Sequence, residues 1–207
     1  MTGNKDALEI EVKFFLENPE AVRGKLTGDA VVVEPRIFET NLRYENPSNG
    51  LIREGKLLRL RRDRGCRLTF KSRSHEQQKQ FKIHRELEVE VNDCDAMGAI
   101  LEELGFKAVQ VYEKWRETFS LHDALVCLDT MPYGDFLEIE GSENSIRLVA
   151  GRLGFAWEHR ILENYLSIFD LLRRGAGLPF TDVTFDNFRR FPVEMTDYLD
   201  LVRVSAE

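Results

Sequence analysis

The chain has 207 residues, of which 43% are hydrophobic and 31% are charged, and its formal net charge is -7. This length and composition suit one globular domain with a real core, or one domain with a small appendage. The acidic balance argues against a general nucleic-acid-binding protein. The sequence also lacks a run of about 18 apolar residues, so we expect no membrane-spanning helix.

The cysteines point to a reducing compartment. Cys66, Cys94 and Cys127 are odd in number, scattered, and lack the spacing of a metal site. The N-terminal residues contain no apolar signal-peptide core. We therefore expect reduced thiols and a cytoplasmic protein. The sequence leaves the oligomeric state open, with a homodimer as one arrangement.

The first predicted strand lies near the N-terminus, where charged and apolar residues alternate strictly. Glu9, Glu11 and Lys13 share one face of this strand, because successive side chains of a strand point to opposite sides. Two carboxylates on one face repel each other unless a cation lies between them. Mg²⁺ and Mn²⁺ are such cations, since both prefer carboxylate oxygens. For a lone strand, a solvated polar face is the simpler interpretation.

The remaining elements follow from alternation, helical periodicity and turn residues. Asn18 and Pro19 predict a helix start, because Asn is a good N-cap and Pro suits the first helical position. Gly105, Gly154 and Gly175 are the predicted helix stops. The predicted helices cover 19–26, 93–104, 145–153 and 164–174, and further strands cover 37–44, 56–63, 66–73, 81–91, 111–121, 124–129 and 135–141.

Six or more strands with interspersed helices predict an α+β fold with a mainly antiparallel sheet. A polar loop is expected at 75–79. From Pro179 onward the periodicity is weak, and four phenylalanines indicate that this tail packs back onto the body. They are Phe180, Phe185, Phe188 and Phe191.

Charged alternation recurs in at least six predicted strands, each with an ionised face backed by an apolar face. Basic and acidic rows are grouped by strand rather than mixed, which a solvated exterior explains poorly. The alternative is a closed barrel with a polar, charged interior and an apolar outside covered by helices. Unpaired buried charges would be prohibitive, so such an interior must hold water, metal and a polyanion. The rows are Arg59 and Arg61; Arg67, Thr69 and Lys71; Lys82, His84, Glu86, Glu88 and Glu90; Lys114, Arg116 and Thr118; Glu138 and Glu140.

The order of these motifs resembles the CYTH domain, also called the triphosphate tunnel metalloenzyme family, over roughly residues 7 to 172. The resemblance implies a closed eight-stranded antiparallel β-barrel that forms a tunnel flanked by helices. We expect this domain at 7–175, followed by a C-terminal extension at 176–207 that packs on the barrel. The motifs are Glu9-x-Glu11-x-Lys13, Leu58-Arg59-Leu60-Arg61, Leu68-Thr69-Phe70-Lys71, Arg85-Glu86-Leu87-Glu88, Tyr112-Glu113-Lys114-Trp115-Arg116, Leu128-Asp129, and Gly134-Asp135-Phe136-Leu137-Glu138-Ile139-Glu140-Gly141.

Carried over by position, the resemblance implies two sets of site residues and Mg²⁺ or Mn²⁺ as the cofactor. The metal ligands would be Glu9, Glu11, Glu138 and Glu140, with Asp129 as an additional candidate. The residues that hold phosphates would be Lys13, Arg59, Arg61, Lys71, Arg85, Lys114 and Arg116.

Arg85 conflicts with the alternation of its own strand. Strict parity puts it on the face opposite Glu86 and Glu88, so either a β-bulge re-aims it or it is structural. Among other residues of the charged strands and their surroundings, we interpret His84 as a hydrogen-bonding wall residue. Tyr165 is interpreted as a packing residue, with closure of one tunnel mouth as the alternative.

Three functions remain open. The first is hydrolysis of tripolyphosphate or an organic triphosphate, with Glu86 or Glu88 orienting the attacking water and Lys13 among the catalytic residues. The second is cyclisation of ATP, in which the ribose 3′-OH attacks the α-phosphate and yields cyclic AMP and pyrophosphate. The third is a non-catalytic polyphosphate- or nucleotide-binding module, although a pure binder would not need four metal-placed carboxylates.

Two departures from the family pattern favour hydrolysis of a small substrate. Cyclases of this family carry a His-Phe pair just before the first strand, where this chain has Lys5 and Asp6. A thiamine triphosphatase is expected to carry a Trp where this chain has Leu57. Both differences favour a base-free small-molecule triphosphate such as inorganic tripolyphosphate.

Overall fold

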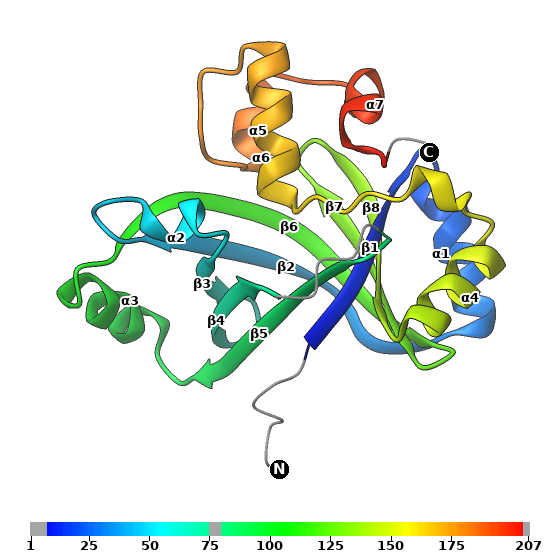
Figure 1. Cartoon of the computed structure of the whole chain (residues 1–207), viewed down its shortest axis with the longest axis horizontal. Helices are drawn as coiled ribbons and strands as arrows, with labels where there is room; N and C mark the ends of the chain where they lie inside the picture. Colours follow the sequence, from blue (N-terminus) through cyan, green and yellow to red (C-terminus); the bar gives the residue numbers. More distant parts are fainter. Residues whose placement is uncertain (1–7, 75–79, 205–207) are drawn as a thin grey trace.

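The computed structural model describes residues 8–74 and 80–204, and its centre is a ring of eight antiparallel strands (Figure 1). The order around the ring is β1-β5-β4-β3-β2-β6-β7-β8, and β8 pairs with β1 again. The loop expected at 75–79 lies outside the described residues. The α+β, antiparallel prediction is confirmed. The strands are β1 (Leu8–Leu16), β2 (Val31–Glu45), β3 (Leu57–Arg62), β4 (Cys66–Arg73), β5 (Lys82–Val91), β6 (Lys107–Leu121), β7 (Ala124–Met131) and β8 (Gly134–Gly141).

The strands β2 and β6 extend further than the alternation predicted. Each has 15 residues, and they pair with each other over most of their length. The pairing shifts register between Val32 and Glu34 and again between Glu34 and Ile37, around Pro35. Proline cannot donate to a ladder and is tolerated at such irregularities. Pro35 and the apolar run at 31–33 break the alternation, so the sequence pattern did not predict residues 31–36 as part of the strand.

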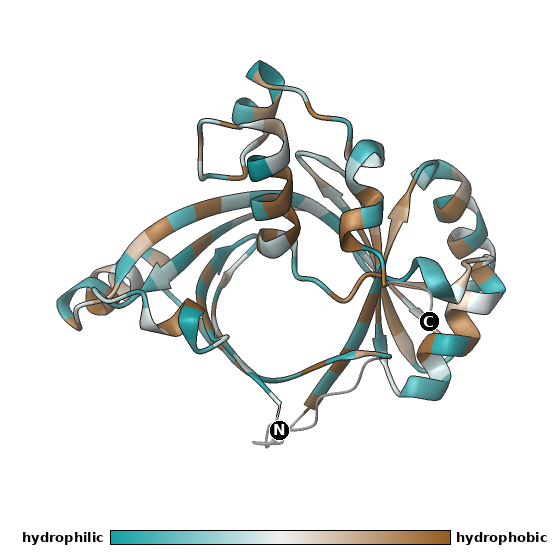
Figure 2. Ribbon diagram, turned by 45° about the horizontal axis from the view of Figure 1, so that its top comes forward, coloured by the Kyte–Doolittle hydropathy of each residue, from teal (hydrophilic) through white to brown (hydrophobic). Residues whose placement is uncertain are grey.

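Two helices cover one side of the ring. The helices α1 (Pro19–Asp29) and α4 (Glu143–Leu153) lie together beside β1, β7 and β8 (Figure 1). Leu26 and Ile146 are fully buried in a cluster with the outward-facing apolar residues of these strands. The alternation of hydrophilic and hydrophobic residues along the strands is visible in Figure 2. Because helices bury the hydrophobic faces of these strands (brown in Figure 2), the charged faces line the inside of the ring.

The C-terminal part of the chain covers one end of the ring. It contains α5 (Tyr165–Ala176), α6 (Phe185–Arg190) and α7 (Leu199–Val202), with short 3₁₀ turns at Trp157–His159 and Met195–Tyr198. Val183 pairs with Val111 and Glu113 of β6 through two backbone hydrogen bonds of 2.8 and 2.9 Å. Among the described residues of the tail, Phe188 is buried against Tyr133 and Phe169.

Local signals placed most helix ends correctly. The side chain of Asn18 accepts a hydrogen bond from the Ala21 amide, and Asp93 caps α3 (Cys94–Glu103) in the same way. Gly154 ends α4 with a φ of 86°, a left-handed conformation that suits glycine. The stop predicted at Gly175 is wrong, because α5 runs to Ala176 and the left-handed cap is Gly177. A one-turn helix, α2 (Gly50–Arg53), lies between β2 and β3.

The expectation of three reduced cysteines is also wrong. Cys66 and Cys94 form a disulfide with their Cα atoms 5.6 Å apart, and only Cys127 is free within the described residues. The bridge joins the start of β4 to the start of α3, which packs on the outer face of β3 through Leu101. A spacing of 28 residues carries no motif, so only the tertiary fold reveals the pair. No helix among the described residues is long and apolar enough to cross a membrane.

We expect the disulfide to stabilise the fold by restricting the unfolded chain. Closure of a loop of this length contributes roughly 3–4 kcal/mol in the chain-entropy model. Replacing both Cys66 and Cys94 by Ser lowers the free energy of unfolding by about that amount in urea titrations, and removes its sensitivity to dithiothreitol. Cys127→Ser serves as the control that keeps the sensitivity. Identical unfolding of the wild type with and without reductant would contradict the bridge.

Candidate active site

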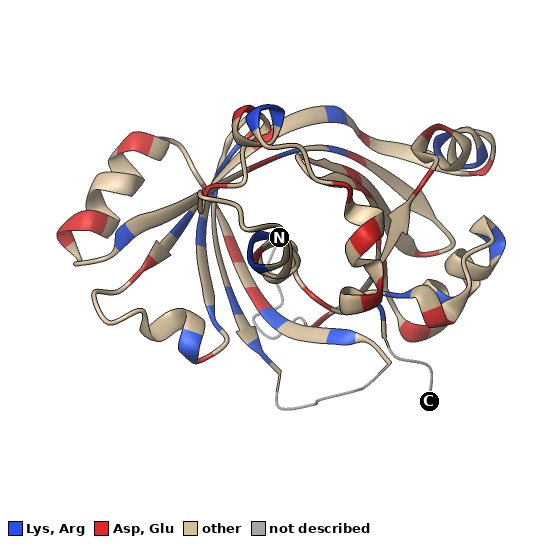
Figure 3. Cartoon of the chain, turned by 90° about the horizontal axis from the view of Figure 1, so that it is seen from above, with Lys and Arg blue, Asp and Glu red and all other residues tan. Residues whose placement is uncertain are grey.

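The inner face of the ring is lined by charged side chains from all eight strands. Because every second residue points inward, the parity seen in the sequence decides which charges meet. Figure 3 shows acidic and basic residues along the strands as they surround the ring. Lys13, Arg59 and Arg61 are all less than 9% exposed, so these cations are held inside rather than solvated.

Glutamates gather where β1 meets β8 and β5. In the strand register Glu11 lies opposite Glu140 and Lys13 lies opposite Glu138. The Lys13 ammonium contacts Glu11 and lies 3.0 Å from Glu138 Oε2. Glu9 faces His84 across the β1–β5 pair. The four glutamates that the sequence assigned to metal binding therefore come from neighbouring strands of one part of the ring.

The pKa values of these glutamates reflect their crowding. Burial, with repulsion from Glu9, Glu138 and Glu11, raises the pKa of Glu140 to about 8. Burial of Glu11 acts in the same direction but is exceeded by Lys13, Lys82 and Lys71, which lower the pKa of Glu11 well below its usual value. Protein cations thus compensate some carboxylates of the group and leave Glu140 undercompensated.

Lys71 connects this group to β5. Its Nζ lies 2.8 Å from Glu9 Oε2 and 2.5 Å from Glu86 Oε2. Burial and a hydrogen bond with Glu9 raise the pKa of Glu86 to about 7, against the attraction of Lys71. Lys82, a residue of the charged row of β5, lies 2.6 Å from Glu11 Oε1.

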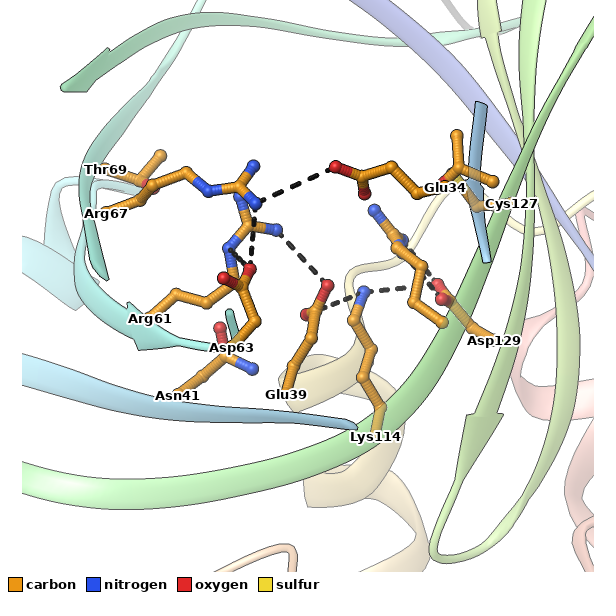
Figure 4. A network of polar contacts seen from close by, with 12 residues as sticks. Glu34, Glu39, Asn41, Arg61, Asp63, Arg67, Thr69, Lys114, Cys127 and Asp129 are labelled. Carbon is orange, nitrogen blue, oxygen red and sulfur yellow. Dashed lines mark hydrogen bonds and ion pairs between the residues drawn. The ribbon is translucent and has the colours of Figure 1, made fainter. Parts of the chain in front are cut away.

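A second group of ion pairs lies across β2, β6 and β7, as Figure 4 shows. Asp129 accepts hydrogen bonds from Arg116 Nε at 2.7 Å and from Lys114 Nζ at 3.3 Å. Lys114 also lies 3.6 Å from Glu39 Oε2, which has no hydrogen-bond partner. Arg61 contacts the other oxygen of Glu39 at 3.4 Å. Asp129 is therefore paired with cations here, apart from the glutamates of β1.

The arginines of β3 are held by polar neighbours on both sides. Arg59 donates to Thr69 at 3.1 Å and to the Tyr112 hydroxyl at 3.2 Å. Arg61 donates to Glu88 at 3.1 Å, and Thr69 donates to the same carboxylate at 2.7 Å. Both guanidinium groups thus point inward between β2, β4 and β6, ready to receive an anion.

Tyr165 of α5 closes the interior at the C-terminal end. Its hydroxyl donates to Asp129 Oδ2 at 2.7 Å, and the ammonium groups of Lys13 and Lys114 lie 5.2 and 5.5 Å from its ring centre. Its ring also packs edge-to-face on Phe136 at 5.4 Å. Tyr165 is therefore both a packing residue and a wall of the charged interior.

The opposite end contains a polar cavity of about 680 Å³. Its lining comes from the β3–β4 turn, the end of β5 and the beginning of β2, and it carries charges of both signs. Arg67 spans it, 2.9 Å from Asp63 Oδ2 and 4.0 Å from Glu34 Oε1. Among the described residues that line it, none has an aromatic side chain.

Arg85 is the one predicted site residue that lies outside this interior. The β4–β5 register runs without a shift from Cys66 opposite Val91 to Arg73 opposite His84. No bulge re-aims Arg85, which is exposed and lies on the face opposite Glu86. The parity of the strand, rather than the family pattern, gave its correct orientation.

Several interior residues were missing from the sequence-based assignment. All but Tyr165, which lies on helix α5, share the inward face of a strand, but the resemblance gave none of them a role at the site. They are Glu39, Asn41, Thr69, Lys82, His84, Tyr112 and Tyr165.

The residues present fit a divalent cation. Glu9, Glu11 and His84 offer ligand atoms within 4.8 Å of one another, and Glu140 lies across from Glu11. Carboxylate oxygens are the ligands of Mg²⁺ and Mn²⁺. The raised pKa of Glu140 indicates excess negative charge at this place, which a cation would offset.

The free energy of unfolding of the metal-free protein should therefore depend on pH. Because the pKa of Glu140 in the folded protein is about 8 and its usual value is about 4.3, folding favours the protonated form. The contribution of Glu140 to the free energy of unfolding is therefore fully present below about pH 4, and is lost as pH rises towards 8.

Glu140→Gln keeps a neutral side chain at every pH. With a chelator present, we expect this variant to unfold at a higher urea concentration than the wild type at pH 9, with a smaller difference at pH 4. Glu17→Gln, at an exposed position directly after β1, is the matched control. A difference that does not change with pH would contradict the raised pKa of Glu140.

Comparison with known proteins places this site in a family context. A family model described as the CYTH domain matches residues 7–152. The search of curated proteins found no match. Solved structures with a similar fold include the PH1012 protein from Pyrococcus horikoshii OT3, with 30% identity, a TM-score of 0.64, and 76% of this chain and 96% of that chain covered.

Two more distant structures share the fold. A candidate adenylate cyclase from Vibrio parahaemolyticus is 19% identical with a TM-score of 0.68, covering 80% of this chain and 99% of that one. HpAC1 from Hippeastrum, a candidate adenylyl cyclase described as having a dominant triphosphatase activity, is 20% identical with a TM-score of 0.58. That match covers 83% of this chain and 98% of HpAC1.

Proposed function

The chain belongs to the CYTH family, and from this premise we propose that it is a divalent-metal-dependent triphosphatase whose reaction takes place inside the ring, as in a tunnel. The observation that carries the proposal is the interior itself. Buried cations from β1, β3, β4 and β6 face carboxylates from β1 and β8 across one enclosed space. Inorganic tripolyphosphate is the preferred substrate.

The proposed phosphate-binding residues are already paired with carboxylates. Arg59 and Arg61 contact Glu88, and Lys71 contacts Glu9, so their donors point to the interior. A polyphosphate would take over these charge-assisted hydrogen bonds, which are about twice as strong as neutral ones. Lys13, Lys114 and Arg116 would hold further phosphate oxygens. The carboxylates released from these cations would then need another positive partner.

A divalent cation supplies that partner. Glu9, Glu11, Glu138 and Glu140 are the residues we propose to hold it, whereas Asp129 keeps Arg116 and Tyr165 in place. When bound, the metal offsets charge that develops on the transferred phosphoryl group. The cofactor would be Mg²⁺ or Mn²⁺.

Glu86 is the better of the two candidate general bases. Its pKa of about 7 suits a group that must accept a proton near neutral pH. Glu88, in contrast, is engaged by Arg61 and Thr69. In the proposed step, water attacks the terminal phosphorus and gives its proton to Glu86. The bond to the leaving oxygen breaks, and phosphate and pyrophosphate are released.

Features at both ends of the interior support a substrate without a base. Tyr165 and Tyr112 direct their hydroxyl groups to Asp129 and Arg59 at one end. The described residues that line the cavity at the opposite end are charged, polar or aliphatic, and none offers an aromatic ring on which a base would stack. Leu57, at the start of β3, offers only an aliphatic side chain where a thiamine triphosphatase would carry Trp.

The proposal predicts metal-dependent release of phosphate, fastest with tripolyphosphate. Purified protein is incubated with Mg²⁺ or Mn²⁺ and either tripolyphosphate or ATP, and phosphate, pyrophosphate and cyclic AMP are measured. Cyclic AMP formed with equal pyrophosphate would make the protein an adenylate cyclase instead. Binding without any turnover would identify a polyphosphate-binding module.

Arg61→Ala should reduce kcat/KM by about 30- to 1,000-fold. This range corresponds to about 2–4 kcal/mol for the loss of a buried charge-assisted contact to the reacting phosphates. Arg152→Ala removes an exposed arginine from the end of α4, outside the ring, and should leave kcat/KM close to that of the wild type. Equal values for Arg61→Ala and the wild type would exclude Arg61 from the substrate site.

A further inference from the structure

His84 occupies a place in the glutamate group that no family motif assigns. It lies on β5 directly opposite Glu9, and only 6% of its surface is exposed. Its Nε2 is 2.7 Å from Glu9 Oε2, while its Nδ1 is buried without a hydrogen-bond partner. Together with Glu11, these residues offer three ligand atoms within 4.8 Å.

The side chains of Glu9 and His84 already contact one cation, the ammonium group of Lys71. The Lys71 ammonium lies 2.8 and 3.2 Å from the two oxygens of Glu9 and 3.1 Å from His84 Nε2. An ammonium group only donates hydrogen bonds, so a hydrogen bond from Lys71 to His84 would need the lone pair of Nε2 to face the ammonium. An imidazole nitrogen and a carboxylate that both face one cation form the donor set of a metal site.

No single protonation state of a neutral imidazole satisfies both contacts of Nε2. With the proton on Nδ1, Nε2 accepts from Lys71, and then two acceptors, Nε2 and Glu9 Oε2, lie 2.7 Å apart. With the proton on Nε2, the contact to Glu9 is made, but the contact to Lys71 joins two donors. Adjacent ligands at about 2.1 Å from an octahedral ion are about 3 Å apart, so a divalent cation resolves the conflict.

We infer that His84 is a ligand of the divalent cation, together with Glu9 and Glu11, and that its nitrogen makes the site selective for Mn²⁺ over Mg²⁺. The inference rests on the proposed function and specifies its cofactor. Mg²⁺ is a hard ion that takes oxygen ligands, whereas imidazole favours first-row transition metals. Lys71 then leaves the position it shares with the cation and turns to phosphate.

The direct test is pulsed electron paramagnetic resonance of Mn²⁺ bound to the wild-type protein without substrate. We expect a nitrogen coupling of the strength of a directly bound imidazole. The coupling should disappear in His84→Ala and persist in His159→Ala, which removes an exposed histidine of the 3₁₀ turn at Trp157–His159. The wild-type spectrum does not depend on how any variant folds.

Metal selectivity gives a second readout. His84→Glu replaces Nε2 by a carboxylate oxygen of similar reach, and the ratio of Mn²⁺ to Mg²⁺ affinity, measured by calorimetry, should fall at least about tenfold. Absence of nitrogen coupling in the wild type, or an unchanged ratio in His84→Glu, would overturn the role of His84 without contradicting metal-dependent hydrolysis of tripolyphosphate. Absence of any divalent-cation binding would overturn the proposed function as well.

Discussion

Charge compensation inside the ring is the constraint on which the rest of the structure depends. A buried ion without a partner costs several kcal/mol, so the inward-facing charges need partners of opposite sign from nearby strands. Lys13 between Glu11 and Glu138, and Asp129 between Arg116 and Lys114, show how neighbouring strands supply these partners. Under the proposed function, a bound polyanion and cation would exchange partners with these paired charges.

Apolar packing on the outside of the ring stabilises the strands that carry this charged interior. Helices α1 and α4 bury the apolar faces of β1, β7 and β8, and α3 does the same for β3. Helix α5 covers one end, where Tyr165 presents its hydroxyl to Asp129 and its ring to Phe136. The apolar core thus lies in three clusters around the strands, and the polar residues face inward.

Much of the fold and of the site follows from local sequence. Strand alternation has a period of two, so the faces of Arg59, Arg61 and Lys71 are set by parity alone. Parity also corrected the family pattern at Arg85. The order of strands around the ring and the Cys66–Cys94 bridge depend on partners far apart in sequence, and no local pattern encodes them. The place of His84 became meaningful only once β5 was paired with β1.

The central claim is that the interior binds a triphosphate and a divalent cation together. A crystal structure of the protein with Mn²⁺ and a non-hydrolysable imidotriphosphate tests it most directly. We expect anomalous density for Mn²⁺ beside Glu9 and Glu11, and phosphate groups bound to Arg59 and Arg61. Phosphate or metal bound only on the outer surface, with the interior ion pairs unchanged, would contradict it.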